Sequence, residues 1–470
     1  MMGEDEMLKL LRRDRAFYRR LVALTVPMLL QNLISSSAGM VDTLMVGMLG
    51  QTELSGVSLA NTPFFVAMLF VFGLQSGGAV LTSQYWGKRD VTTINRVMGI
   101  SWYLACIIST LFATVVFLFP DKIMSITTNN SALLAVAVRY GRIVAFSYAL
   151  NSFVMVFTGT MRSCEQPLVG TTIVIMGMFA NVFFNWMLIF GKLGAPAMGV
   201  EGAALGTLLA RVVELLLVVA YLIFYKKKPF KMDIRRILRP GRMIFSDYIK
   251  YSLPVMINET LWGAGASTYP IIYGHMAAST DIVAAHAVSG NIEKVVTIAV
   301  FSLAHTAAIM VGKEIGAGGK KKEVTGLGKT IAALATTVGL ASGLLLLGML
   351  FTVIRPYLFP LFSLSASAER IATVMLAAMS AVMMFRSFNC TLIVGILRGG
   401  GDVKFGMFLD IGSMYMWSIP LGFIAGLVLK LDITVVFLLI ISEEVIKSAI
   451  GFLRFRSGKW VRNVTREMVK

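Results

Sequence analysis

Asp42 combines an ionisable side chain with a strongly apolar setting. It lies in the stretch from Pro27 to Gly47, PMLLQNLISSSAGMVDTLMVG, which matches the roughly 20 residues needed to cross a bilayer. A charge inside a span costs roughly 2.5 to 3.5 kcal/mol on insertion scales, so such residues usually face a wet cavity on an ion or substrate path. In a helix over 26–49, Asp42 would lie roughly 7 Å past the midpoint. We therefore predict that Asp42 binds an ion or a cationic substrate; the alternative is a carboxylate satisfied by a neighbouring helix.

Charged residues recur in other apolar stretches. Arg211 and Glu214 lie three residues apart in one, and Glu293 directly precedes Lys294 in another. Pairing within each set is favoured, because intramembrane charges usually pair with one another. Glu293 also stays a candidate for a substrate cleft. No role is assigned to the acids of the last two stretches, Asp410, Glu443 and Glu444.

The composition is that of a membrane protein. Hydrophobic residues make up 57% of the chain and charged residues 14%, against about 25% charged in a soluble domain. The mean hydropathy is +0.77. The net charge of +18 is better explained by basic loops on one side of a membrane than by binding to nucleic acid.

Other chemistries are not indicated. The three cysteines and three histidines lack the spacing of a disulfide framework or a zinc site. The run Gly326-Leu-Gly328-Lys329-Thr330 ends like a phosphate-binding loop, but the first glycine of that motif is missing and no strand precedes it. No HExxH, GxSxG or paired catalytic aspartate motif is present. We expect neither an enzyme nor a cofactor.

The hydropathy pattern predicts twelve transmembrane helices and an all-α fold. In the first half of the chain they cover residues 22–49, 54–81, 97–119, 138–160, 167–190 and 201–224. In the second half they cover residues 247–276, 282–311, 328–353, 368–395, 404–428 and 433–454.

The basic residues gather in segments that this arrangement places on one side of the membrane. They occur before the first span and after spans two, six, eight and ten: Arg12, Arg13, Arg15, Arg19, Arg20, Lys88, Arg89, Arg96, Lys226–Arg236, Lys320–Lys322, Arg398 and Lys404. By the positive-inside rule, both termini are predicted to be cytoplasmic.

The chain divides into two similar halves. We predict a first lobe at residues 1–225, a cytoplasmic linker at 226–245 and a second lobe at 246–470. Pro27, Gln31 and Gly47 match Pro254, Asn258 and Gly274 at one constant offset, and Gly159-Thr-Met-Arg162 matches Gly395-Ile-Leu-Arg398. Internal repeats with a site between them are typical of secondary transporters that alternate access.

Five motifs occur in an order that resembles the multidrug and toxic compound extrusion (MATE) family of the multidrug/oligosaccharidyl-lipid/polysaccharide flippase superfamily. They are Val41–Gly47 with Gly50, Asn181–Gly191, Gly199–Thr207, Gly312–Gly318 and Gly395–Gly399. The resemblance covers nearly the whole chain. It implies a V-shaped bundle of two six-helix lobes that expels organic cations in exchange for H+ or Na+.

The resemblance also implies a coupling-ion site in the first lobe at Asp42, Asn181, Asn185 and Thr207. Many relatives have Asp where this chain has Asn185, so Asp42 is left as the fixed anion there. Na+ prefers several carboxylate and carbonyl oxygens, so this loss favours protons slightly over Na+ at Asp42 and Asn181. Hydrogen bonding between helices is the alternative role for the two asparagines.

The second lobe is predicted to contribute Glu259, where part of the family carries a cation-binding Glu. Glu259 is interpreted as a proton acceptor or a contact for the cationic substrate, with a purely structural role as the alternative. Some relatives add an Asp in span ten, but this chain reads Arg386-Ser-Phe-Asn389-Cys390 there. Gln31 and Asn258, at matching places in the two halves, are also predicted to contact ion or substrate.

The leading hypothesis is a monomeric antiporter in the cell membrane that exports organic cations in exchange for H+ or Na+. Burial disfavours the charged form of a carboxyl group; protonation would remove the charge that holds the cation, and deprotonation would restore it. The alternative is a lipid-linked precursor flippase of the same superfamily. Its cavity is expected to be cationic, whereas the two best cavity candidates here, Asp42 and Glu259, are acidic.

Overall fold

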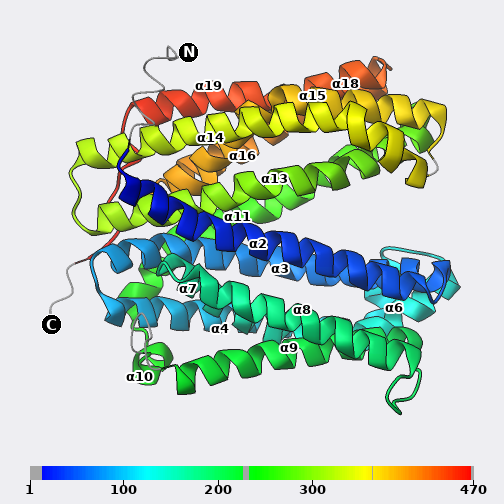
Figure 1. Ribbon diagram of the computed structural model, residues 1–470, viewed down its shortest axis with the longest axis horizontal. Helices are drawn as coiled ribbons and strands as arrows, with labels where there is room; N and C mark the ends of the chain where they lie inside the picture. Colours follow the sequence, from blue (N-terminus) through cyan, green and yellow to red (C-terminus); the bar gives the residue numbers. More distant parts are fainter. Residues whose placement is uncertain (1–12, 226–231, 363, 467–470) are drawn as a thin grey trace. The chain divides into compact units, whose positions relative to one another are not determined.

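The computed structural model describes residues 13–225, 232–362 and 364–466. Arg12 and the first part of the predicted linker, residues 226–231, lie outside the described residues. Within the described ranges every regular element is a helix (Figure 1), so the predicted all-α fold is confirmed.

Up to residue 266 the chain contains ten helices in the described ranges. They are α2 (Arg15–Gly47), α3 (Gln51–Gly87), α4 (Val91–Leu118), α5 (Pro120–Ser125), α6 (Ser131–Val144), α7 (Ser147–Ser163), α8 (Pro167–Phe190), α9 (Gly199–Phe224), α10 (Ile234–Leu238) and α11 (Arg242–Ala266). Both α2 and α11 contain an internal proline, Pro27 and Pro254, at the matching positions of the predicted repeat.

The chain after residue 266 is more segmented. Its α-helices are α12 (Thr268–Gly274), α13 (Ser279–Gly316), α14 (Lys321–Met349), α15 (Ala366–Cys390), α16 (Val403–Ser413), α17 (Ile419–Phe423), α18 (Ile433–Ile441) and α19 (Glu443–Arg456). Four π-helical segments continue some of them: η1 (Leu350–Leu358), η3 (Thr391–Leu397), η4 (Met414–Ser418) and η5 (Ile424–Val428). One 3-10 turn, η2 (Phe359–Phe362), follows η1.

Nine helices of the described chain are long and apolar enough to cross a membrane. The pair α6 and α7, bent by 53°, passes the same test when its two helices are taken together as one broken span. The other two predicted spans correspond to α11–α12 and to α18–α19, and they fall short of this test. In α11 the polar residues Asn258 and Glu259 interrupt the apolar run, whereas α18 and α19, with 9 and 14 residues, are each too short.

The chain forms two compact units. Unit 2 comprises Val26–Glu259, and unit 1 comprises Met1–Thr25 together with Thr260–Lys470. The borders fall inside α2 and α11, so each of these helices contributes residues to both units.

Small residues bring the helices of unit 2 close together. A Cβ added at Gly73 would lie 2.4 Å from the Cα of Met256, and one at Gly77 would lie 2.3 Å from the Cα of Ser252. These two glycines of α3 are four residues apart, the spacing that lets helix backbones approach in membranes. Tyr248 then donates its hydroxyl to the carbonyl of Leu74 at 2.8 Å. The contact between α3 and α11 is therefore specified by glycine.

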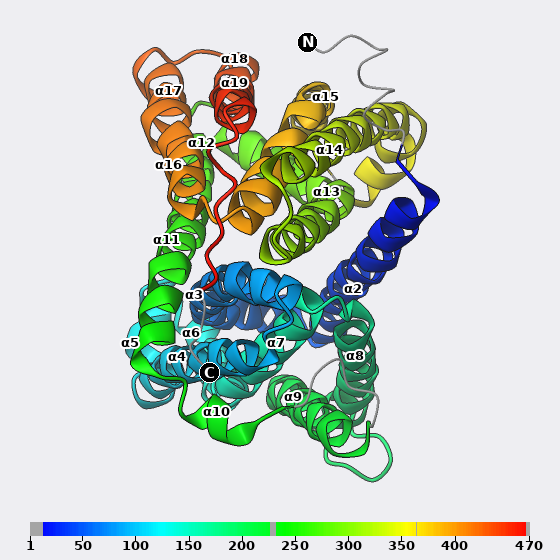
Figure 2. The same cartoon turned by 90° about the vertical axis from the view of Figure 1, so that its left-hand side faces the viewer.

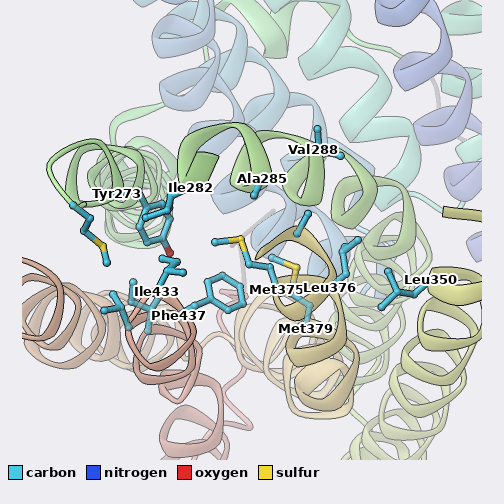
Figure 3. Close-up of a cluster of buried hydrophobic side chains, with 14 of the residues drawn as sticks. Tyr273, Ile282, Ala285, Val288, Leu350, Met375, Leu376, Met379, Ile433 and Phe437 are labelled. Carbon is cyan, nitrogen blue, oxygen red and sulfur yellow. The ribbon is translucent and has the colours of Figure 1, made fainter. Parts of the chain in front are cut away.

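The apolar core of unit 1 forms between α12, α13, η1, α15 and α18 (Figure 3). Figure 3 shows Tyr273, Ile282, Met375 and Phe437 among the side chains that point toward one another across these helices. In Figure 2 the helices α13, α14 and α15 lie side by side, in agreement with their mutual contacts. Dispersion contacts and close packing hold such helices together in lipid, where burial against water contributes little.

Candidate functional site

Asp42 and Asn185 form the shortest polar contact of the predicted first-lobe site. Asn185, fully buried on α8, donates from Nδ2 to Oδ1 of Asp42 on α2 at 2.6 Å. Hydrogen bonds to a charged group are shorter and roughly twice as strong as neutral ones. Asp42 itself is half-buried. The carboxylate is thus held from one side by an amide while part of it stays accessible.

Asn181 and Thr207 extend this contact across α8 and α9. Asn181 lies one turn before Asn185 and accepts from its Nδ2 at 3.4 Å, and it donates to Oγ1 of Thr207 at 3.5 Å. Both distances exceed the usual range for N–H···O bonds, so these bonds are weak. All four residues predicted for this site, Asp42, Asn181, Asn185 and Thr207, therefore form one chain of polar contacts inside unit 2.

Glycines of α9 make room for this arrangement. A Cβ at Gly206 would lie 2.2 Å from Oδ1 of Asn185, and one at Gly202 would lie 2.5 Å from the carbonyl oxygen of Leu188. Only a residue without a side chain lets α8 and α9 approach this closely. Oδ1 of Asn185 is buried and has no hydrogen-bond partner among the described residues. The amide therefore keeps an unused acceptor beside the backbone of Gly206.

Tyr140 and Asn61 belong to the same site, although no sequence motif distinguishes them. Tyr140 of α6 is 2% exposed, and its hydroxyl forms hydrogen bonds with Thr207 and with Asn61 of α3. It also interacts electrostatically with Asp42. No spacing pattern distinguishes Tyr140 from the other apolar residues of α6, so only the fold reveals its place here.

Arg211 and Glu214 form the predicted ion pair on α9. Arg211 donates from Nη1 to both carboxylate oxygens of Glu214, at 2.8 Å and 2.6 Å. Gly177 of α8 makes space for it, because a Cβ there would lie 2.1 Å from Oε1 of Glu214. Arg211 is near enough to Asp42 to interact electrostatically, but its hydrogen bonds go to Glu214. The predicted pairing is confirmed.

Three further candidates, Gln31, Asn258 and Glu259, lie on α2 and α11. Gln31 precedes Asp42 on α2 by about three helical turns, roughly 16 Å at 1.5 Å per residue. Asn258 is 3% exposed, and Glu259 is half-buried at the border of unit 2. Their roles in binding stay predictions.

Glu293 on α13 is paired, but not with the expected residue. Its carboxylate forms a short ion pair with Arg386 of α15. The expected partner, Lys294, is its neighbour in sequence, and residues i and i+1 of a helix do not face each other. The pairing with Lys294 is therefore a wrong prediction. The residue that neutralises Glu293 is Arg386, which the sequence distinguished only as part of a stretch without an acid.

The site contains one carboxylate, which can bind and release a proton or a cation, among neutral hydrogen-bonding groups. No group of three or more His, Cys, Asp or Glu side chains in the described part of the chain is arranged to hold a metal ion. The contact nearest to Asp42 is an amide N–H, which binds an anion and repels a cation. A proton can bind the carboxylate without any further ligand, whereas Na+ needs several oxygens.

Comparison with known proteins agrees with the internal repeat. The family model MatE matches the chain twice, at residues 27–187 and 254–424. The two matches begin at Pro27 and Pro254, the prolines that head the predicted repeat. The two halves are thus two copies of the same unit of sequence.

Relatives and solved structures cover almost the full length. The uncharacterized transporter YisQ of Bacillus subtilis is 24% identical over 96% of both chains. The probable multidrug resistance protein NorM of Thermotoga maritima is also 24% identical, over 96% of this chain and 95% of its own. A MOP superfamily transporter from Pyrococcus furiosus, described as having a binding pocket of reverse polarity that suggests a different function, shares the fold. It has a TM-score of 0.83 and 19% identity, over 97% of this chain and 98% of that one. With two copies of the family model spread over most of its length, this chain belongs to the MatE family of membrane transporters.

Proposed function

We propose that the chain is a secondary antiporter that exports organic cations in exchange for an inward-moving proton. The observation that carries this proposal is the bond of 2.6 Å from Asn185 to the half-buried carboxylate of Asp42. An ionisable carboxylate inside a span is costly, and the carboxylates that do occur there usually mark an ion or substrate path. Its bonding to one amide, rather than to an arginine, leaves it able to gain and lose a proton.

Exchange follows because a proton and an organic cation compete for the single negative charge of Asp42. With Asp42 ionised, the site attracts an organic cation; with Asp42 protonated, the attraction is gone and the cation leaves. If each form prefers a different orientation of the transporter, the proton gradient drives export. We favour H+ over Na+ as the coupling ion, because Asn185 presents a donor to Asp42 where a second carboxylate would be needed to bind Na+ well.

The remaining assignments accompany this proposal. We propose that Glu259 accepts a proton or contacts the substrate, and that Gln31 and Asn258 line its route. We also propose that the transporter works as a monomer in the cell membrane with both termini in the cytoplasm, and that residues 1–225 and 246–470 act as two lobes joined by the linker at 226–245.

The test is efflux of ethidium from cells that express the chain. Asp42→Asn removes the charge while keeping the shape, so it should abolish efflux driven by a pH gradient. Glu201→Gln is the matched control, because Glu201 is an acid of α9 whose side chain is 41% exposed and lies in a long ion pair with Arg139, 3.8 Å apart. Efflux by Asp42→Asn at the wild-type rate would contradict the proposal. Translocation of a lipid head group in vesicles, without ethidium efflux, would favour the flippase alternative instead.

A further inference from the structure

Unit 1 contains a second buried cluster of charges, on helices that take no part in the Asp42 site. Its centre is Lys447 of α19, which is 4% exposed. The ammonium Nζ lies 3.0 Å from Oδ1 of Asp410 on α16 and 3.7 Å from Oε1 of Glu443, one turn earlier on α19. Helix α19 packs against both α15 and α16, so three helices meet at this cluster.

Glu443 is the least compensated carboxylate of this cluster. It is 8% exposed, and its Oε2 is buried without a hydrogen-bond partner among the described residues. Its neighbour Glu444 has a hydrogen-bond donor, because Asn389 donates to Oε2 of Glu444 at 2.7 Å. Ser448 in turn donates to Asn389 at 2.9 Å. The hydrogen bond of Lys447 goes to Asp410. Glu443 is left with a longer electrostatic contact and an unused oxygen.

The charges of the cluster do not balance when all groups are ionised. The ionisable groups linked to one another by electrostatic interactions here come from five parts of unit 1: Tyr269, Glu293, Arg386, Cys390, Arg398, Asp410, Glu443, Glu444 and Lys447. Four carboxylates stand against two arginines and one lysine, so one negative charge is left over. An uncompensated charge away from water is expensive, and a bound proton removes it.

The helices around the cluster are irregular at the points nearest to it. Segment η3 begins at Thr391, directly after Asn389 and Cys390, and η4 begins at Met414, one turn after Asp410. Short π-helical stretches inside α-helices occur frequently at functional sites. Oγ1 of Thr391 is a further buried polar atom without a partner among the described residues. The cluster therefore adjoins two places where a span can change its hydrogen bonding.

We propose that unit 1 has a proton-binding site of its own, in which the carboxyl of Glu443 takes up and releases a proton beside Lys447. The proton comes from water, binds Oε2 and returns to water, and no other bond forms or breaks. A metal cation does not fit, because the ammonium of Lys447 already occupies the space between Glu443 and Asp410. A role for this proton as a second coupling ion rests on the proposed antiport. The binding of the proton at Glu443 does not depend on that proposal.

Infrared difference spectra of the purified chain in lipid nanodiscs, between about pH 5 and pH 8, test the site directly. We expect Glu443→Gln to lose one pH-dependent band of a protonated carboxyl group that Glu444→Gln retains, and Asp42→Asn to lose a different one. A spectrum of Glu443→Gln identical to that of the wild type would overturn the proposal. So would removal of the Glu443 band by Na+ at constant pH.

A conservative variant covers the case in which Glu443→Gln does not fold. Glu443→Asp keeps the carboxyl on a shorter stem, so its band should shift in frequency and in pH midpoint; an unshifted band would overturn the assignment. Because the spectra need no transport, they separate this site from the antiport proposal. If efflux is absent while the Glu443 band is present, the proposed function fails and the proton site stands.

Discussion

Gly206→Ala tests the first-lobe site through a residue that carries no functional group. A Cβ at this position would lie 2.2 Å from Oδ1 and 3.3 Å from Cγ of Asn185. The side chain of Asn185 must move away, and its bond of 2.6 Å to Asp42 is lost. Such a bond to a charged group contributes about 1.5 to 3 kcal/mol. We therefore expect ethidium efflux to fall by about 10- to 100-fold.

A double-mutant cycle shows whether this loss acts through Asn185. In an Asn185→Ala background the clashing amide is absent, so Gly206→Ala should have little further effect, and the two changes should be strongly non-additive. Gly39→Ala is the control, because Gly39 is on α2 near Asp42 and a Cβ there meets nothing within 4 Å; it should preserve efflux. Additive losses, or full efflux by Gly206→Ala, would refute the reasoning.

Three further predictions concern stability, measured by thermal unfolding of the purified chain. Glu293→Gln should destabilise it by about 3 kcal/mol, because Arg386 is left without its partner. Gly77→Ala should cost roughly 1 to 3 kcal/mol by overpacking α3 against α11. Hydrogen bonds from Thr434 at the start of α18 hold the pKa of Asp432 below its ordinary value. Its contribution should be present above about pH 3.9 and lost as the pH falls through the lowered pKa, and Asp432→Asn should remove this dependence while it keeps the cap.

Each of these stability predictions has a control. Arg386→Met added to Glu293→Gln should restore part of the stability, since the guanidinium that lost its ion-pair partner is then removed as well. Gly348→Ala is matched to Gly77→Ala, because a Cβ at Gly348 meets nothing within 4 Å. An unchanged melting temperature for Glu293→Gln or Gly77→Ala would contradict the packing described above. A pH profile of Asp432→Asn that matches the wild type would contradict the role of this carboxylate.

The sequence carried enough signal for the fold and for part of the site. Long apolar runs predicted the spans, and the matching prolines predicted the repeat, which the two MatE matches confirm. Asp42 was detectable because a carboxylate is rare in an apolar run. Tyr140 was not, because an aromatic residue in a span is ordinary until the fold places its hydroxyl beside Thr207.

The charged cluster around Lys447 could not be predicted from the spacing of residues in the sequence. Asp410 and Lys447 are 37 positions apart in the sequence, and Asn389 and Glu444 are 55 positions apart. Because both separations are long, no local sequence pattern predicts either contact. Glu293 likewise pairs across helices with Arg386 rather than with its neighbour. Contacts between helices depend on crossing points, which here are set by glycines such as Gly202 and Gly206.

Transport by reconstituted protein under separate gradients tests the central claim most directly. Ethidium export should be driven by a pH gradient without Na+, should not be driven by a Na+ gradient at constant pH, and should be lost in Asp42→Asn. Export by Asp42→Asn at the wild-type rate under the pH gradient would contradict the account, because the carboxylate held by Asn185 would then have no part in the exchange.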